Sequence, residues 1–281
     1  MNAHQHLENI LQHNRDGSYG TQAARADVLH QLINDLHKNG YSDFKLKKIG
    51  SRHIETIVKD WKSKELSNAT MANRLSHCRW LSQKLNKQNI VPRTNKELGI
   101  GRRSFVAETD KSNQLPEPQT MRNFTPREQL SMQLARAFGL RREESLKFNV
   151  NQADKGNKIE LKGSWCKGGR PRSLKVRTQA QRTLLNKIKA LTPRGSLIEK
   201  HKTYIQALKT FEKHCQDNHL RMHGLRHAYA LDRYKALTGR NAPVRSDEPT
   251  PRDKIDLAAR AVIAKELGHN RVDITKNYLG S

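Results

Sequence analysis

The sequence predicts a mainly α-helical protein with one small antiparallel β-sheet, divided into two domains. Apolar residues recur at helical spacing through most of the chain. One glycine-rich segment lies between two short runs that are typical of strands. A polar segment with two prolines separates two helical regions, and a length of 281 residues also favours two domains.

Helical patterns fill the first third of the chain. Apolar residues recur at helical spacing from Thr21 to Asn39, and Gly40 follows as a stop signal. We expect Ser51 to cap a second helix and a third helix to run from about Asn68 to Lys87. Their apolar stripes are interpreted as the core of a helical domain over residues 1–107.

The composition changes at residues 108–121, which we interpret as a linker because they are polar and contain prolines. Regular structure is expected to restart at Thr125, with Pro126 in the first helical position and Glu128 closing a capping box. Residues 122–281 are therefore predicted to form the second domain.

Further elements of the second domain follow from the same patterns. Residues 159–161 and 173–176 are candidate strands, joined by a glycine-rich turn over residues 163–171. Helices are predicted over residues 178–191, 202–217, 223–236 and 256–267, with a last short one reaching about residue 278. Residues 237–256 interrupt this pattern and are interpreted as an inserted loop.

The chain is strongly basic, with 53 Lys and Arg against 27 Asp and Glu and a formal net charge of +26. Residues 1–120 carry a net charge of +7, and residues 121–281 carry +19. Because a polyanion releases counterions when Lys and Arg replace them, nucleic acid is the predicted partner. Ribosomal binding, an acidic membrane surface and simple solubility remain alternatives on charge alone.

Several classes of protein are excluded. No stretch approaches the roughly 18–20 apolar residues that a membrane span needs, and the N-terminal residues do not form a signal peptide. Three scattered cysteines are too few for a disulfide framework or a zinc site. We therefore expect a cytoplasmic, nucleoid-associated protein in a reduced compartment.

Four separated motifs carry residues suited to phosphate chemistry. They read GLRREE at 139–144, KGGRPR at 167–172, HGLRH at 223–227 and LGH at 267–269, with Tyr278 nine residues after the last. Guanidinium groups bind phosphate oxygens through a planar fork of donors, and histidines transfer protons. A tyrosine hydroxyl can attack a phosphodiester and keep the phosphate as an ester.

In this order the motifs resemble the catalytic domain of the tyrosine recombinase (phage integrase) family. That family carries G-x-R-x-x-E, a β-hairpin lysine with a trailing basic residue, H-x-L-R-H, and L-G-H with a tyrosine nine residues on. The resemblance covers residues 121–281, whereas the N-terminal half matches only in general character. It implies a helical core-DNA-binding domain joined to a catalytic domain.

The resemblance implies six catalytic residues, which are Arg141, Lys167, His223, Arg226, His269 and Tyr278. Tyr278 would be the nucleophile that forms a 3′-phosphotyrosyl link. The two arginines would stabilise charge on the non-bridging oxygens, and His269 would add a hydrogen bond to the same phosphate. His223 would handle protons near the nucleophile, and Lys167 would protonate the leaving 5′-oxygen. No step needs a metal or a cofactor.

Some assignments have neighbours that compete with them. Arg142 adjoins Arg141, but the spacing from Gly139 favours Arg141, with Glu144 as its structural support.

The hairpin offers three lysines. Lys162 and Lys175 lie in the same unit as Lys167, but Arg172, five residues further on, reproduces the trailing basic position and favours Lys167. Cys166 beside it is either a thiol of low pKa or incidental.

The resemblance predicts a site-specific recombinase acting on double-stranded DNA. Four protomers on two core sites would exchange strands through a four-way Holliday junction, to integrate or excise a mobile element or to resolve replicon copies. It allows an accessory DNA-bending protein as a further partner. Two alternatives stay open: a type IB topoisomerase, which lacks site specificity, and a non-catalytic basic architectural protein.

The 237–256 segment has two interpretations. Only three residues follow Tyr278 in this sequence, so the segment either supplies part of the contact between subunits or is a solvent-exposed loop.

Overall fold

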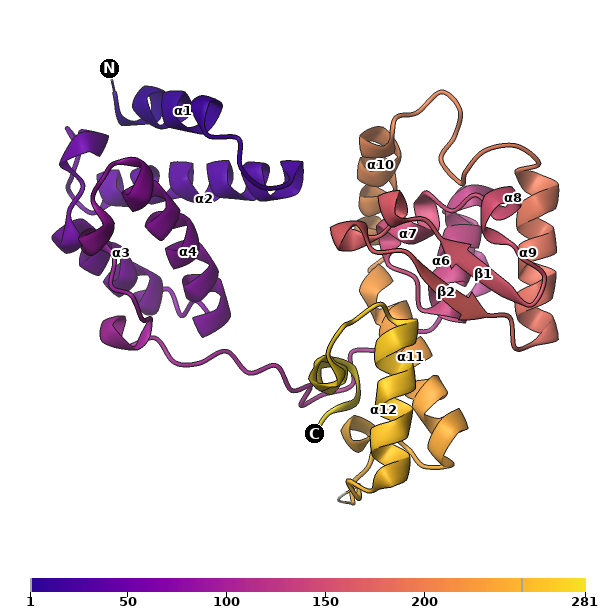
Figure 1. The fold of residues 1–281 in the computed structure, drawn as a ribbon. Coiled ribbons are helices and arrows are strands. Elements are labelled where there is room, and N and C mark those ends of the chain that lie inside the picture. The colour runs from indigo at the N-terminus through magenta and orange to yellow at the C-terminus, as the bar shows by residue number, and fades with distance from the viewer. Residues whose placement is uncertain (1, 249) are drawn as a thin grey trace. The chain divides into compact units, whose positions relative to one another are not determined.

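The computed structural model describes residues 2–248 and 250–281, and it divides the chain into two compact units between Ser104 and Phe105 (Figure 1). The predicted fold class is confirmed: helices dominate, and the sheet has two antiparallel strands. No helix within the described residues is long and apolar enough to cross a membrane. The domain limits predicted at 107 and 122, and the roles given to the two domains, stay predictions.

The N-terminal unit is a small helical assembly. Its helices are α1 (Ala3–His13), α2 (Tyr19–Lys38), α3 (Ser51–Ser63) and α4 (Asn68–Lys84), with 3₁₀ turns η1 (Leu46–Lys48), η2 (Gln88–Ile90) and η3 (Lys96–Leu98). The apolar stripes read from the sequence meet in one core, in which Leu29, Ile33 and Trp61 are almost completely buried. Burial of these stripes is the main stabilising contribution to this unit.

Three local features differ from the sequence-based expectations. The first helix, α1, was not predicted, although Asn2 and Gln5 form a capping box at its start. The cap of α3 is Gly50 rather than Ser51, because His53 Nδ1 accepts the Gly50 N–H at 3.1 Å. Helix α4 ends at Lys84 instead of Lys87, since the chain turns into a left-handed conformation two residues later.

The C-terminal unit begins with a segment that lacks regular structure and then becomes helical. Its first elements are α5 (Pro118–Met121), α6 (Pro126–Phe138), α7 (Arg142–Leu146), α8 (Val150–Ala153), β1 (Lys158–Leu161) and β2 (Arg172–Lys175). The remaining helices are α9 (Gln179–Leu191), α10 (Tyr204–Asp217), α11 (Met222–Thr238), α12 (Lys254–Glu266) and α13 (Lys276–Leu279). The turns are η4 (Gly163–Trp165), η5 (Lys167–Gly169), η6 (Pro243–Arg245) and η7 (Val272–Thr275).

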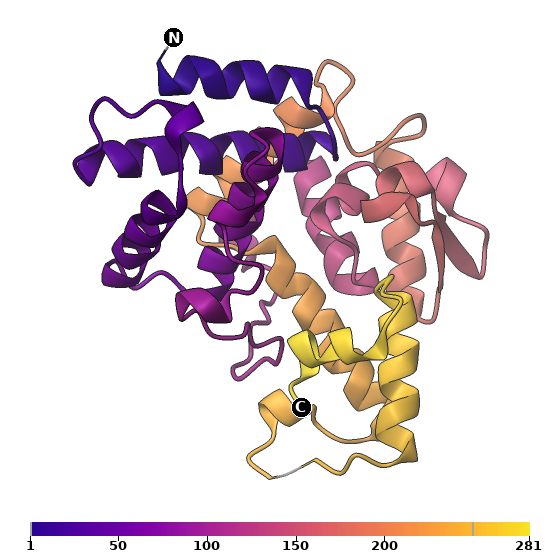
Figure 2. The same ribbon diagram turned by 60° about the vertical axis from the view of Figure 1, so that its left-hand side comes forward.

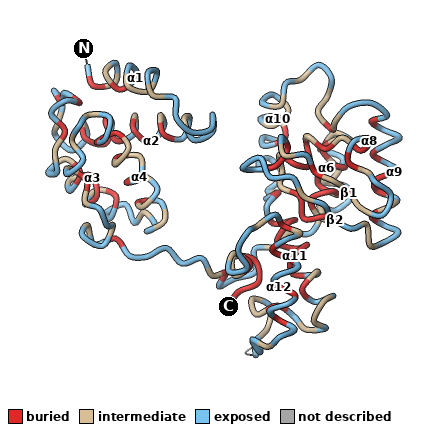
Figure 3. The backbone as a smooth tube through the Cα atoms, in the orientation of Figure 1, coloured by how far each residue is buried: buried red, intermediate tan, exposed pale blue. Residues whose placement is uncertain are grey.

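Helix α11 lies at the centre of this unit. It is buried along most of its length (Figure 3), and it packs against α6, α12 and α13. Figure 2 shows α12 and α13, the last helices of the chain, in yellow beside it. The motif 223–227 therefore lies on a helix that the other motif-bearing segments surround.

Two sequence signals set the ends of elements here as expected. Thr125 caps α6, its side chain accepts the Glu128 N–H at 3.3 Å, and the Glu128 carboxylate returns to the Thr125 N–H at 2.8 Å. Strands β1 and β2 pair antiparallel, with Leu161 opposite Arg172. The connection between them is not a simple glycine turn, because it contains η4 and η5.

The segments interpreted as linker and inserted loop make specific contacts within the C-terminal unit. The Asn113 N–H donates to the Gly224 carbonyl at 3.0 Å, and Arg245 pairs with Asp110 at 2.7 Å. Part of 237–256 is therefore anchored to the unit, and Pro249 within it lies outside the described residues. A role for this segment in subunit contact stays a hypothesis.

The turn between α6 and α7 leads to a stability prediction. Gly139 has φ of +64°, and a Cβ there would lie 2.5 Å from the Tyr229 ring. Gly156 has φ of +78° with open space around it, so it is a matched control. We expect Gly156→Ala to cost about 1–2 kcal/mol from backbone strain alone. Gly139→Ala should cost about 1–3 kcal/mol more from overpacking.

Urea unfolding of both variants measures the difference. Equal free energies of unfolding for the two variants would contradict the packing argument.

Candidate active site

The hydroxyl of Tyr278 lies at the centre of a group of three side chains. Arg226 Nε donates to this hydroxyl at 3.3 Å, and His269 Nε2 lies 3.2 Å from it. Because a guanidinium only donates, the tyrosine oxygen accepts from Arg226. The imidazole tautomer decides which atom donates in the contact with His269. Tyr278 is 5% exposed and lies on α13, so the hydroxyl is fixed by packing as well as by hydrogen bonds.

Arg226 is completely buried, and each of its nitrogens has a partner. Nη1 donates to the carbonyl of Gly139, and Nη2 donates to the carbonyl of Leu267 and lies 3.4 Å from His269 Nε2. Burial lowers the pKa of this guanidinium to about 10, which leaves it charged at neutral pH. One arginine from α11 therefore gathers the ends of α6 and α12 and the tyrosine of α13.

The local fold explains how these carbonyls become available. Gly139 ends α6 and Gly268 follows α12, both in the left-handed conformation that favours glycine. The second turn returns the chain so that the His269 N–H donates to the Ala264 carbonyl at 2.8 Å. The imidazole of His269 is thereby aimed back at the helix bundle.

The histidines of the site are held in the neutral form. Burial and the nearby charges of Arg226 and Arg141 lower the pKa of His269 to about 4. Partial desolvation and the same two arginines lower the pKa of His223. A neutral imidazole can accept a proton at physiological pH, so either residue is in the correct form for a base.

The two histidines differ in position. The His223 and Tyr278 ring centroids lie 5.9 Å apart, whereas His269 is within hydrogen-bond distance of the hydroxyl. Our expectation gave proton handling near the nucleophile to His223 and phosphate binding to His269. The geometry favours His269 for the contact with the hydroxyl.

Arg141 is held by the carboxylate of Glu144. Arg141 is the N-cap of α7, and Glu144 Oε2 accepts its N–H at 2.7 Å while Oε1 accepts Nη1 at 2.8 Å. Burial would raise the pKa of Glu144, but hydrogen bonds and charge from Arg172 lower it to about 2. The carboxylate is ionised and fully buried, so it supports the arginine without reaching a substrate.

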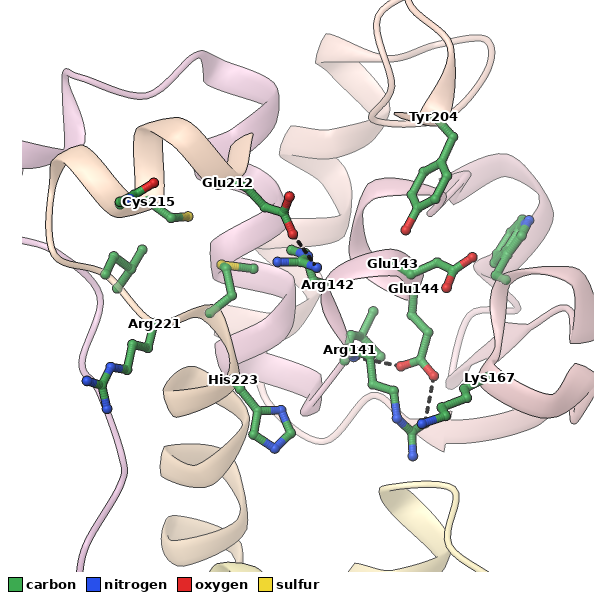
Figure 4. A pocket seen from close by; sticks show the side chains of 15 residues that line it. Arg141, Arg142, Glu143, Glu144, Lys167, Tyr204, Glu212, Cys215, Arg221 and His223 are labelled. Atoms are coloured by element: carbon green, nitrogen blue, oxygen red, sulfur yellow. Dashed lines mark hydrogen bonds and ion pairs between the residues drawn. The ribbon is translucent and has the colours of Figure 1, made fainter. Parts of the chain in front are cut away.

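A pocket of about 660 Å³ is lined by Arg141, Lys167 and His223, among others (Figure 4). Figure 4 shows these three side chains converging from α7, the hairpin turn and the start of α11. Lys162 and Lys175 are not among the residues that line it, which supports the choice of Lys167. Arg142 also lines the pocket but pairs with Glu212 at 2.8 Å on its other side.

The six predicted residues thus fall into two adjoining groups. One comprises Arg141, Lys167 and His223 around the pocket, and the other comprises Arg226, His269 and Tyr278. The ring contact between His223 and Tyr278 joins them.

Two contributors were not assigned a role from the sequence. Arg172 donates to both oxygens of Glu144, and the buried ring of His227 packs on Tyr278 with centroids 4.7 Å apart. The trailing basic position of Arg172 was visible in the sequence, but its partner was not. Burial raises the pKa of Cys166, which is against a reactive thiolate there.

Two family models match the sequence. The model described as integrase matches residues 119–232, and the model described as phage integrase, N-terminal, matches residues 2–91. The chain belongs to the tyrosine recombinase family. The first match includes the motifs of Arg141, Lys167 and Arg226, whereas His269 and Tyr278 lie beyond it. No curated protein sequence matches this tyrosine recombinase at a significant level.

Solved structures share the fold of this tyrosine recombinase. The Tn1549 transposon integrase in complex with circular intermediate DNA is 12% identical, with a TM-score of 0.56 over 100% of this chain and 96% of that one. XerH recombinase in a post-cleavage complex with palindromic difH substrate is 18% identical, with a TM-score of 0.60 over 98% and 80%. A λ integrase dimer bound to a COC′ core site is 14% identical, with a TM-score of 0.63 over 98% and 75%.

The buried histidines predict how stability depends on pH. Burial lowers the pKa of His227 to about 4, as at His269, whereas an unfolded histidine titrates near 6.5. The unfolded chain therefore binds more protons between these values, and stability should fall as pH falls from about 6.5 towards 4. The slope is at most about 1.4 kcal/mol per pH unit for each histidine.

Urea unfolding between pH 7 and 5 checks this dependence. His227→Gln should reduce the slope, and the same substitution at the exposed His201 should leave it unchanged. An unaltered slope in His227→Gln would show that other groups cause the acid sensitivity.

Proposed function

We propose that this chain is a site-specific DNA recombinase that cleaves and rejoins duplex DNA through a 3′-phosphotyrosyl intermediate. The observation that carries the proposal is the Tyr278 hydroxyl, 3.3 Å from Arg226 Nε and 3.2 Å from His269 Nε2. A phosphate bound beside this arginine would therefore lie next to the tyrosine oxygen.

The electrostatics of the site support an anionic substrate. Arg141 and Arg172 share one buried carboxylate, that of Glu144, and Arg226 pairs with no carboxylate, so the three arginines carry excess positive charge. The pentavalent transition state accumulates negative charge on its non-bridging oxygens, where guanidinium donors stabilise it. Catalysis then consists of positioning and charge stabilisation.

Strand cleavage in this proposal is a transesterification at phosphorus. The Tyr278 oxygen forms a bond to phosphorus and its proton passes to a neutral imidazole, for which His269 is in place. The bond from phosphorus to the 5′-oxygen breaks, and Lys167 gives that oxygen a proton. No water is consumed, so the 5′-hydroxyl of a second strand can reverse the step and join the strands.

The wider role follows from the family and from the charge. Four protomers on two core sites would exchange strands in pairs through a Holliday junction, and the element served would be mobile DNA. Similar solved structures are complexes with circular-intermediate DNA of a transposon, difH DNA and core-site DNA, which supports duplex DNA as the partner. The excess of basic residues would hold duplex DNA largely without regard to sequence.

A trapped adduct tests the nucleophile. The core site is selected from random-sequence DNA retained by the protein, and a nick beside the cleavage point prevents rejoining. We expect the wild type to form a covalent protein–DNA adduct and Tyr278→Phe to form none, because the attacking oxygen is missing.

Tyr204→Phe is the matched control, since Tyr204 lines the pocket but does not belong to the hydrogen-bonded group of Arg226, His269 and Tyr278. An adduct in Tyr278→Phe, or its absence from the wild type, would contradict the proposed chemistry. A wild type that forms no adduct would favour the non-catalytic architectural protein.

Relaxation of supercoiled plasmid separates recombinase from topoisomerase. We expect little relaxation of a plasmid without the selected core site, because cleavage requires the assembled site. Agarose gels resolve the topoisomers. Efficient turnover on an arbitrary plasmid would favour the type IB topoisomerase instead.

A further inference from the structure

Arg172 joins three parts of the C-terminal unit. It is the first residue of β2, and its guanidinium donates to Glu144 Oε1 at 2.6 Å and to Oε2 at 2.7 Å. Its Nε donates to the Glu266 carbonyl at 3.1 Å, at the end of α12. The side chain is only 8% exposed, and its charge is compensated by the Glu144 carboxylate, whereas the hydrogen bonds of Arg226 go to uncharged groups, so Arg172 is not arranged to bind DNA.

Glu144 continues the connection towards the phosphate site. The same carboxylate that receives the fork of Arg172 also accepts both the N–H and the Nη1 of Arg141. A continuous ion-paired chain therefore runs from the hairpin strand through Glu144 to the guanidinium that is expected to bind phosphate. Buried and bidentate pairs of this kind have a narrow range of geometry.

The tip of the hairpin turn does little by itself to fix Lys167. Residues 167–170 are exposed, and Gly168 and Gly169 have positive φ. The turn is closed, since a Cβ on Gly163 would lie 2.5 Å from the Gly169 carbonyl oxygen. One side of it is anchored by Trp165 and Cys166, which are buried in the core. The other side is anchored by Arg172, five residues after Lys167, whose Nη1 lies 3.7 Å from Cys166 Sγ and whose fork reaches Glu144 of α7.

We propose that Arg172 is a positioning residue for the general acid. Through Glu144 it holds the hairpin in register with Arg141, so that the Lys167 ammonium meets the 5′-oxygen of the same phosphate that Arg141 binds. In that step the bond from Tyr278 oxygen to phosphorus forms, the bond from phosphorus to the 5′-oxygen breaks, and the lysine proton moves to that oxygen. This inference rests on the proposed function.

The test changes one atom of the DNA. Two nicked duplexes of the selected core site carry either oxygen or sulfur at the 5′-bridging position. A thiol has a pKa near 8.5, far below that of an alcohol, so a thiolate leaves without a proton. A defect in the acid or in its placement should slow cleavage of the oxygen substrate and largely disappear with sulfur.

Arg172→Lys keeps the charge beside Glu144 but loses the fork that reaches three acceptors. The measurement is the ratio of single-turnover cleavage rates, sulfur over oxygen. An unfolded fraction lowers both rates equally, so this ratio reports only the folded protein. Arg182→Lys is the matched control. Arg182 donates to both carboxylate oxygens of Asp154, at 2.6 and 3.2 Å, and this pair is not part of the site.

We expect the ratio to rise by about tenfold or more in Arg172→Lys and further in Lys167→Ala, within the 10²–10⁴ that a positioned acid contributes. Arg182→Lys should keep the wild-type ratio. Arg172→Lys with a wild-type ratio, whether its two rates fall together or stay normal, overturns the inference. If Lys167→Ala itself leaves the ratio unchanged, the acid role in the proposed function fails, and the inference fails with it.

Discussion

The buried guanidinium of Arg226 is the constraint on which the arrangement of the C-terminal unit depends. A charge in the protein interior is costly unless it is hydrogen-bonded, and each nitrogen of this guanidinium has a partner. In the described part of the chain none of its hydrogen-bond partners is a carboxylate; they are two carbonyls, a hydroxyl and an imidazole.

Those partners belong to two regions far apart in sequence, at residue 139 and at residues 267–278. The carbonyls come from Gly139 and Leu267, and the hydroxyl comes from Tyr278. Loss of any one of these acceptors would leave a buried N–H of Arg226 without a partner. The hydrogen bonds that this one charge requires therefore bring the motifs together around Arg226. Left-handed turns at two glycines belong to the same arrangement. The turn at Gly139 presents its carbonyl to Arg226, and the turn at Gly268 places His269 beside it.

The chemistry follows from the charge that this arrangement leaves uncompensated. Glu144 is shared by Arg141 and Arg172, so Arg226 has only dipoles around it. Burial and the positive potential of Arg226 and Arg141 lower the pKa of His223 and His269 and keep both neutral. That potential lies where a phenolate and a phosphate would develop negative charge. Because these groups are fixed before substrate arrives, little reorganisation is needed in the transition state.

The sequence predicts the fold class and the long helices because apolar periodicity and caps are local signals. The capping box at Thr125 could be read directly, and so could the stop at Gly139. Helices α7 and α8 are too short for a period to be visible, and α1 buries only Ala3 and Leu7. The family resemblance of the motifs implied the six candidate residues, but not their partners.

Partners are set by tertiary packing. The sequence identifies Arg172 as a trailing basic residue, yet its fork onto Glu144 joins residues 28 positions apart. The contact between Tyr278 and His269, rather than His223, depends on the turn after α12, which no periodicity records. Side-chain roles that rest on long-range hydrogen bonds are therefore the part that a single sequence leaves undetermined.

The six residues of the site differ in how firmly the fold holds them. Arg226 and Tyr278 are buried and bonded to each other, and Arg141 is clamped by a buried carboxylate. Lys167 is exposed on a turn with two glycines in the left-handed conformation. Since Tyr278, the proposed nucleophile, already contacts Arg226 and His269 of its own chain, the placement of Lys167, the proposed acid, is what the hairpin can govern.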